Sequence, residues 1–344
     1  MSPRTSLITV GVAALCALAP IPPATVERVY SNGLYLAIQG WVTPASNQVP
    51  VALLDIAAAC LLISAGAALR SLVRRVGGRR AAARAASTLV GGLALVYLLF
   101  LALWGLNYRR VPLEQKLDYD PSRLTRERAI AFTNTAVLQV NAHYSGAHGT
   151  PLDYPGFQRA FADAQRTLGA RRAAVTGVPK RSLLTFYFRR AAIDGMTDPL
   201  FLEIIVNRDV LDFEWPFVVA HEWAHLAGYA NEAEANFVAW MTCVGGDDLA
   251  RYSGWLAAYQ HAFGALSRAD RRAVARLDGG PLADLNAMSA RYARSSPAVR
   301  EAARGVYDEY LRANRVAEGI GSYDAVVRLL IATRFEDSWR PARR

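Results

Sequence analysis

Two histidines and a glutamate in the sequence HEWAH could hold and use a metal ion. His221 and His225 stand four residues apart in an apolar stretch that is compatible with a helix. Their imidazoles would therefore lie on one helical face and could bind the same ion. Glu222, the residue directly after His221, would lie beside the ion's open coordination position. This HExxH spacing is typical of zinc sites in which a carboxylate takes a proton from zinc-activated water, so the motif predicts a catalytic site with one Zn²⁺ ion.

A catalytic zinc site generally needs a third protein ligand, and the downstream sequence NEAEAN offers three candidates. Asn231 stands where HExxHxxGxxH would have a histidine, but a neutral amide oxygen is a weaker zinc ligand than a carboxylate. If Gly228 ends the first helix in a left-handed turn and a second helix follows, Glu232 and Asn236 share one face. We therefore expect Glu232 to be the third ligand, with Glu234 as the alternative. Asn236 would accept a hydrogen bond from a ligand histidine.

The segment NEAEAN resembles the glutamate segment of the gluzincin metallopeptidases, such as thermolysin. In these enzymes a ligand glutamate is followed four residues later by an aspartate that is oriented towards a histidine. The matching positions here are Glu232 and Asn236. One difference is that only six residues separate His225 from Glu232, whereas gluzincins usually have a much longer stretch between the two ligands.

The chain as a whole resembles a family of membrane-anchored bacterial zinc-peptidase-like proteins of uncharacterised function. A close-spaced HExxHxxG and ExEAN is the usual arrangement in that family. The resemblance implies a peptide or protein substrate, and it makes Glu203, Tyr307 and Tyr310 candidates for contacts with the substrate or with a developing oxyanion. The segments that carry it are WGLNYRR (104–110), 195–207 with Pro199, Glu203 and Asn207, PFVVAHEWAH, GVYDEYL and SYDAVVRLL.

The positive charge of the chain is concentrated at its N-terminal end. The net charge is +10, and residues 1–110 contain ten arginines against two acidic residues, a net charge of +8, which leaves +2 for residues 111–344. A nucleic-acid-binding protein would need the excess on its folded domain, so the composition argues against a nucleic-acid partner. It favours contact with a membrane lipid bilayer.

Three apolar segments, at about residues 7–21, 51–69 and 88–106, predict an N-terminal membrane anchor within residues 1–110. The second and third have 19 residues each, close to the roughly 20 that a helix needs to cross a bilayer. The arginine-rich loop between them is of the kind that stays in the cytoplasm. We therefore expect a multi-pass protein of the cell (plasma or inner) membrane, with residues 111–344 outside the cytoplasm. The first segment is short and stops at a proline cluster. Ala17, Leu18 and Ala19 resemble a signal-peptidase site, but Pro20 directly after them would hinder cleavage, so we expect a retained anchor rather than a cleaved signal peptide.

The predicted fold is mainly α with a small β-sheet (α+β), with N-terminal transmembrane helices followed by a zincin-like metallopeptidase domain. Residues 29–42 suit either a helix at the membrane interface or one packed on the catalytic domain. Residues 201–206 read as a strand, either an edge strand that pairs with an extended substrate or an internal strand. A second strand is expected at 185–188. Helices are expected near 125–142, 250–263, 267–277, 284–293, 298–313 and 323–334.

These features predict a membrane-anchored zinc metallopeptidase in which Glu222 is the general base. The alternative is a non-catalytic membrane receptor or envelope assembly factor that uses zinc only to stabilise its fold. A structural zinc site is normally closed by four protein ligands, often cysteines, but Cys243 is the only cysteine after residue 60. The sequence therefore favours the enzyme. No feature of it predicts an oligomeric state.

Overall fold

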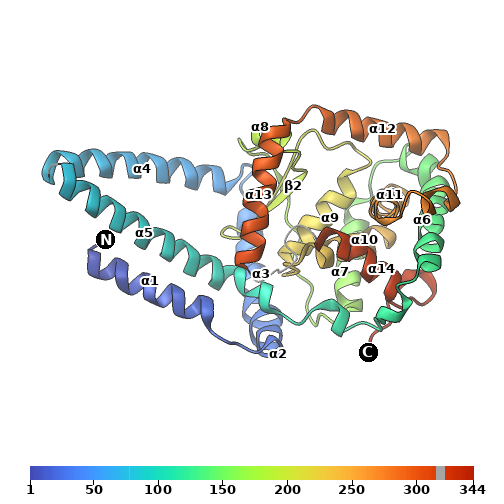
Figure 1. Ribbon diagram of the computed structural model, residues 1–344, viewed down its shortest axis with the longest axis horizontal. Coiled ribbons are helices and arrows are strands. Elements are labelled where there is room, and N and C mark those ends of the chain that lie inside the picture. Colours follow the sequence, from blue (N-terminus) through green and yellow to red (C-terminus); the bar gives the residue numbers. More distant parts are fainter. Residues whose placement is uncertain (77, 315–321) are drawn as a thin grey trace.

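The computed structural model describes residues 1–76, 78–314 and 322–344. Most of these residues are helical, and a small three-stranded sheet completes the fold (Figure 1). The prediction of a mainly α fold with a small sheet is therefore confirmed.

Three helices project together from one side of a helical body (Figure 1). They are α1 (Pro3–Leu18), α4 (Leu53–Val76) and α5 (Gly78–Leu103), and α1 packs along α5. Within α5, Ala82–Leu103 is long and apolar enough to cross a membrane. Pro3–Leu18 reaches that length only together with Pro23–Asn47, from which a bend of 104° separates it, so one or two helices could span a membrane.

The observed apolar helices differ in extent from the predicted spans. The segment predicted at 88–106 corresponds to the candidate at 82–103, and the segment predicted at 51–69 corresponds to the shorter apolar helix at 53–68. The chain leaves α5 at Trp104, where the backbone turns into the 3₁₀ segment η2 (Gly105–Arg109). Glycine is needed at 105, because a Cβ there would lie 2.4 Å from the Phe100 ring.

The segment after α1 packs on the body. It consists of α2 (Pro23–Thr25), the π-helical η1 (Val26–Leu34) and α3 (Tyr35–Asn47). The fully buried Tyr35 donates a hydrogen bond of 2.7 Å to the carbonyl oxygen of Leu226. Thr43 donates one of 2.8 Å to the carbonyl oxygen of Leu202. Of the two interpretations of residues 29–42, the structure therefore supports packing on the body, and the body includes residues that precede 111.

The sheet contains β1 (Pro179–Lys180), β2 (Gly195–Asp198) and β3 (Glu203–Val206) in the order β1-β3-β2. β3 pairs in parallel with β1 and antiparallel with β2. The strand predicted at 201–206 is therefore present as β3, but it is the internal strand. β1 and β2 are the two edge strands, and β2 packs against the helix that carries the histidines.

The prediction of a strand at 185–188 is wrong, because these residues begin helix α8 (Thr185–Ala191). The Ser182 hydroxyl accepts a hydrogen bond from the backbone N–H of Leu184, just before the helix begins. Phe188 is buried against Ala52 of the segment before α4 and Ile205 of β3. This tertiary contact outweighs the β propensity of the aromatic and β-branched residues.

The rest of the body is formed by eight further helices of the described residues, one of which carries both histidines. The predicted helix at 267–277 is reduced to the 3₁₀ segment η5 (Asp270–Ala273), whereas helices cover most of the other predicted ranges. The core contains the fully buried rings of Trp223, Trp240 and Trp255. The eight helices are α6 (Arg126–Ala147), α7 (Tyr154–Thr167), α9 (Trp215–Leu226, with both histidines), α10 (Glu232–Val244), α11 (Asp248–Ala265), α12 (Gly279–Ala293), α13 (Pro297–Ala313) and α14 (Ser322–Ala332).

Candidate metal centre

Both histidines of the motif lie on one face of α9. Pro216 in the first turn favours the start of this helix, and the apolar residues around the motif bury it. The indole of Trp223 donates a hydrogen bond of 2.8 Å to the carbonyl oxygen of Gly177, which fixes the buried side of the helix. On the other side, the Nε2 atoms of His221 and His225 lie 3.1 Å apart, with perpendicular rings.

A tight turn brings Glu232 back to the histidines. Gly228 adopts a φ of +82°, the left-handed conformation that glycine favours after a helix. Asn231 then caps α10, and its side chain accepts a hydrogen bond of 2.9 Å from the backbone N–H of Ala233. Glu232 is the first residue of α10, and its carboxylate oxygens lie 3.3 Å from Nε2 of His221 and 3.5 Å from Nε2 of His225.

The spacing of these three groups fits a metal ion. Ligand atoms on a zinc tetrahedron with bonds of about 2.0–2.1 Å lie about 3.3 Å apart. The two Nε2 atoms are 3.1 Å apart, and each lies at a similar distance from one Glu232 oxygen: Oε2 is 3.3 Å from His221 and Oε1 is 3.5 Å from His225. The Oε2 atom of Glu232 is buried without a hydrogen-bond partner. Nδ1 of His225 donates a hydrogen bond of 2.8 Å to the carbonyl oxygen of Tyr229, which leaves Nε2 as the nitrogen that could bind an ion.

The electrostatics of the cluster favour bound positive charge. Burial by itself would lower the pKa of His225, but the Glu232 carboxylate outweighs it and raises that pKa to about 9. Burial would likewise raise the pKa of Glu232, yet the two histidines hold it well below its ordinary value. A buried carboxylate that stays ionised between two imidazoles is suited to a divalent cation.

Glu222 lies on the side of α9 that faces the edge strand β2. Its carboxylate oxygen Oε2 is 2.8 Å from the hydroxyl of Thr197, and the same hydroxyl is 3.0 Å from the Glu222 carbonyl oxygen. Gly195 leaves room for the carboxylate, because a Cβ at 195 would lie 2.6 Å from Oε1 of Glu222. Burial raises the pKa of Glu222, although the neighbouring histidines act in the opposite direction.

Of the three residues predicted to contact the substrate or an oxyanion, Tyr307 reaches the cluster of His221, His225 and Glu232. Its hydroxyl donates a hydrogen bond to Oε1 of Glu232 from helix α13. Tyr310, one helical turn later, stacks on Tyr307 with ring centroids 5.9 Å apart. Burial raises the pKa of Tyr310 to about 12, although a hydrogen bond with Tyr108 lowers it. Tyr307 is therefore adjacent to the candidate ligand Glu232, and Tyr310 packs against the ring of Tyr307.

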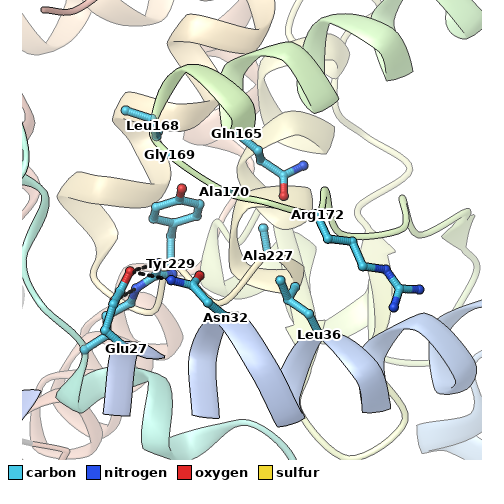
Figure 2. Close-up of a pocket in the computed structure, with 11 residues that line it drawn as sticks. Glu27, Asn32, Leu36, Gln165, Leu168, Gly169, Ala170, Arg172, Ala227 and Tyr229 are labelled. Carbon is cyan, nitrogen blue, oxygen red and sulfur yellow. Dashed lines mark hydrogen bonds and ion pairs between the residues drawn. The ribbon is translucent and has the colours of Figure 1, made fainter. Parts of the chain in front are cut away.

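Glu234, the alternative ligand, points away from the histidines. Its Oε1 atom accepts a hydrogen bond of 2.7 Å from the backbone N–H of Leu113. Close to it, Arg110 pairs with Glu27 at 2.9 Å and donates a hydrogen bond of 2.9 Å to the carbonyl oxygen of Gly228. These groups hold the turn between α9 and α10. Figure 2 shows the small polar pocket beside this turn, which is separate from the metal cluster.

Glu203 is not available to a substrate. Its side chain is fully buried in β3, where it forms an ion pair of 2.7 Å with the equally buried Lys180. It also accepts hydrogen bonds of 3.0 Å from the backbone N–H groups of Leu53 and Leu54 at the start of α4. The interpretation of Glu203 as a substrate or oxyanion contact is therefore wrong, because a buried carboxylate that is fully used by these partners cannot reach solvent.

Asn236 lies in α10 one turn after Glu232 and is buried, as the shared helical face requires. Its Nδ2 atom has no hydrogen-bond partner, and neither has Nδ1 of His221. Within the part of the chain that the structure describes, no hydrogen bond joins Asn236 to either histidine. The expected support of a ligand histidine by Asn236 stays a prediction, whereas His225 is supported by the Tyr229 carbonyl.

A family model described as "Protein of unknown function (DUF3810)" matches residues 30–331. The chain belongs to this family. No curated protein and no solved structure matches the chain. The DUF3810 match begins after α1 and includes α9, α10 and α13, so the whole candidate metal centre lies within it.

Three residues near the candidate metal centre were not singled out from sequence. They are Trp104, whose indole donates a hydrogen bond of 2.9 Å to the carbonyl oxygen of His225, and Gly195 and Thr197, which position Glu222. Each falls within a segment that carried the family resemblance, namely WGLNYRR or 195–207. The resemblance of these two segments to the family could have pointed to the three residues, but only the folded chain shows which side chains in the segments face the site.

Proposed function

We propose that this protein is a membrane-anchored zinc metallopeptidase whose catalytic residues lie outside the cytoplasm. The observation that carries the proposal is the grouping of His221, His225 and Glu232, whose possible ligand atoms all lie within 4.8 Å of one another, with Glu222 next to them on α9. A zinc ion held there would polarise a scissile carbonyl and lower the pKa of water at its open position to about 7.

Glu222 is the general base of the proposed reaction. It takes a proton from the attacking water and later delivers that proton to the leaving amine, so that water is added across the peptide bond. The Thr197 hydroxyl holds one carboxylate oxygen of Glu222, and the absence of a side chain at Gly195 leaves space for the other. A carboxylate fixed in this way stays close to the proton that it must accept.

Two further features support peptide hydrolysis. The Tyr307 hydroxyl lies at the Glu232 carboxylate and can donate a hydrogen bond to a developing oxyanion. The edge strand β2, whose Thr197 touches Glu222, replaces β3 as the strand on which an extended substrate would pair. The catalytic carboxylate and the substrate strand would then be adjacent.

The projecting helices support the proposed topology. The C-terminal end of α4 and the N-terminal end of α5 lie at the end of the projection furthest from the body (Figure 1), and residues 70–84 contain six arginines. A short arginine-rich segment between two spans usually stays in the cytoplasm, so in the proposed topology the body lies on the other side of the membrane. The apolar 16 residues of α4 extend about 24 Å at 1.5 Å per residue, and the side chains of Arg70 and Arg74 beyond them can extend to the lipid headgroups.

The test is to purify the full chain in detergent, measure its zinc content, and profile its cleavage of an unbiased peptide library. Wild type is expected to hold one zinc ion per chain and to cleave peptides, whereas Glu222→Gln should hold zinc and fail to cleave. Glu301→Gln, at an exposed position of α13, is the matched control and should behave as wild type. Cleavage that persists in Glu222→Gln would exclude the proposed base.

A further inference from the structure

The candidate ligands are tied to the end of α5. Trp104 follows directly after the candidate span Ala82–Leu103, and its ring centroid lies 6.2 Å from that of His225. On the other side of the cluster, Tyr310 contacts Phe100 of α5 with ring centroids 6.2 Å apart. Tyr310 in turn stacks on Tyr307, which is hydrogen-bonded to the ligand glutamate. The metal cluster is therefore separated from the end of a candidate membrane helix only by aromatic side chains.

The catalytic glutamate is tied in the same way to the start of α4. Glu222 is held by Thr197 of β2. Met196 of β2 and Leu54 in the first turn of α4 both pack against one small buried cluster, formed by Ala52, Phe188 and Ile205. Asp55, the residue after Leu54, accepts hydrogen bonds from the Ser182 hydroxyl at 2.8 Å and from the backbone N–H of Leu183 at 2.7 Å. The site therefore lies between the bases of the two projecting helices.

The surface around these bases is apolar and aromatic. Leu183 is 84% exposed and Phe186 is 64% exposed, beside the first turn of α4, and the guanidinium of Arg190 lies 4.5 Å from the Phe186 ring centroid. Helix α13 packs against α8 and stands at the side of the body from which α4 and α5 project (Figure 1). Val306, next to Tyr307 on α13, is 74% exposed. Exposed apolar and aromatic groups with an arginine are typical of a protein surface at the lipid headgroups.

We propose that the substrate is a polypeptide anchored in the same membrane, and that it is cut close to where it leaves the bilayer. This inference rests on the proposed peptidase function and names its substrate class. An extended chain covers about 3.3–3.6 Å per residue, so a few residues beyond the bilayer bring a peptide bond to the level of Trp104 and His225. The reaction is hydrolysis: hydroxide adds to the carbonyl carbon, the C–N bond breaks, and the amine receives the proton from Glu222.

The first test locates the site without requiring activity. In full-length protein, Cys16 and Cys60 are replaced by alanine, and Cys243 is kept because it is buried. One exposed cysteine is then added for a fluorophore, either as Val306→Cys or as Leu138→Cys, and the protein is placed in liposomes. Leu138 is the matched control, since it is 65% exposed on α6 at the far side of the body (Figure 1). Lipids with a nitroxide on the headgroup should quench the label at 306 several-fold more strongly than the label at 138. Equal quenching at the two positions would overturn the proposal.

The second test compares substrates. One peptide library is offered in liposomes as free peptides, fused to a transmembrane helix through about 5 residues, or fused through about 30 flexible residues, which extend roughly 30 Å. Wild type should cleave the short-spacer library at least about tenfold faster than the free library, because the tether raises the local concentration at the site. The library with the short spacer should also be cleaved at least as fast as the library with the long spacer.

Three results of the substrate comparison would count against the proposal. Cleavage of free peptides as fast as short-tethered ones, abolished in Glu222→Gln, would leave the peptidase standing and overturn the membrane substrate. Faster cleavage with the long spacer than with the short one would place the site above the bilayer and overturn it as well. No cleavage of any library by zinc-loaded protein would sink the proposed function together with the inference, while the quenching experiment still reports the position of the site.

Discussion

The indole Nε1 of Trp104 donates a hydrogen bond of 2.9 Å to the carbonyl oxygen of His225. Trp104 is the first residue after α5, and His225 lies in the last turns of the helix that carries both candidate histidine ligands. One buried side chain therefore joins the candidate membrane helix α5 to the candidate metal centre, so the packing of α5 on the body also fixes the position of that centre.

Replacing Trp104 by phenylalanine should weaken this connection. The hydrogen bond is lost while much of the ring packing remains, so we expect a loss of about 1 kcal/mol in the free energy of unfolding. Zinc affinity should fall by about tenfold, because the backbone of a ligand residue is less firmly held. Denaturant titration and zinc competition with a chelator measure the two effects. Trp41→Phe is the control, since Trp41 is 82% exposed and should show neither change.

Replacing Thr197 by valine should lower the rate of hydrolysis without removing zinc. Valine keeps the shape of the side chain but cannot bond to the Glu222 carboxylate 2.8 Å away. We expect kcat to fall by about 10- to 100-fold, the range typical of groups that orient a catalytic residue. Thr197→Ser keeps the hydroxyl and should restore most of the rate. Equal losses in the valine and serine variants would show that packing, rather than the hydrogen bond, is what matters.

Replacing Gly195 by alanine should displace Glu222. The added Cβ would lie 2.6 Å from Oε1 of Glu222, and the end of a side chain can move away at little cost in stability. We therefore expect a melting temperature and zinc content close to wild type, with a rate about 100-fold lower because the base is misplaced. Gly264→Ala is the control, since a Cβ at 264 would meet nothing within 4 Å. An unchanged rate in Gly195→Ala would contradict the role of Glu222 as base.

Zinc content should distinguish the two glutamates of NEAEAN. Glu232→Ala removes a group that lies 3.3 and 3.5 Å from the histidine nitrogens, so the folded variant should bind less than one zinc per chain. Glu234→Ala should lose stability, because Glu234 accepts a hydrogen bond from the Leu113 backbone, but keep its zinc. Elemental analysis of the folded fraction measures both. Zinc loss in Glu234→Ala alone would mean that the ligand assignment is wrong.

Asp198 should make stability depend on pH. Its carboxylate accepts hydrogen bonds of 3.1 and 3.0 Å from the backbone N–H groups of Leu200 and Phe201, but burial still raises its pKa from the ordinary 3.8 to about 6. A raised pKa means that the folded state holds the proton more tightly than the unfolded chain. The stability from this group is therefore complete below about pH 4 and is lost as the pH rises through 6, by about 3 kcal/mol in all.

Asp198→Asn cannot ionise and should remove this part of the pH dependence. Between about pH 4 and 6, the unfolding free energy of the variant should rise relative to that of wild type. Denaturant titrations of both proteins at a series of pH values measure the difference. A difference that stays constant over this range would show that Asp198 does not titrate in this way.

The sequence by itself determined the local geometry of the site. Residues four apart in an apolar helix must share a face, which places His221 beside His225 whatever surrounds them. Gly228 followed by NEAEAN predicted a left-handed helix end and a second helix, and the turn has a φ of +82° with Asn231 as the cap. This short-range geometry was enough to bring Glu232, rather than Glu234, to the histidines.

Only the tertiary structure decided what surrounds these residues. Thr197, Trp104 and Tyr307 are distant in sequence from α9, and their contacts depend on the packing of β2, α5 and α13 around it. The same packing turned residues 185–188 into a helix by burying Phe188, and it enclosed Glu203 in an ion pair with Lys180. Propensity and spacing describe a few residues at a time, whereas burial and ion pairing depend on which distant segments meet. That is why the sequence could indicate the candidate metal ligands, and only the folded chain showed that they lie between the bases of the projecting helices.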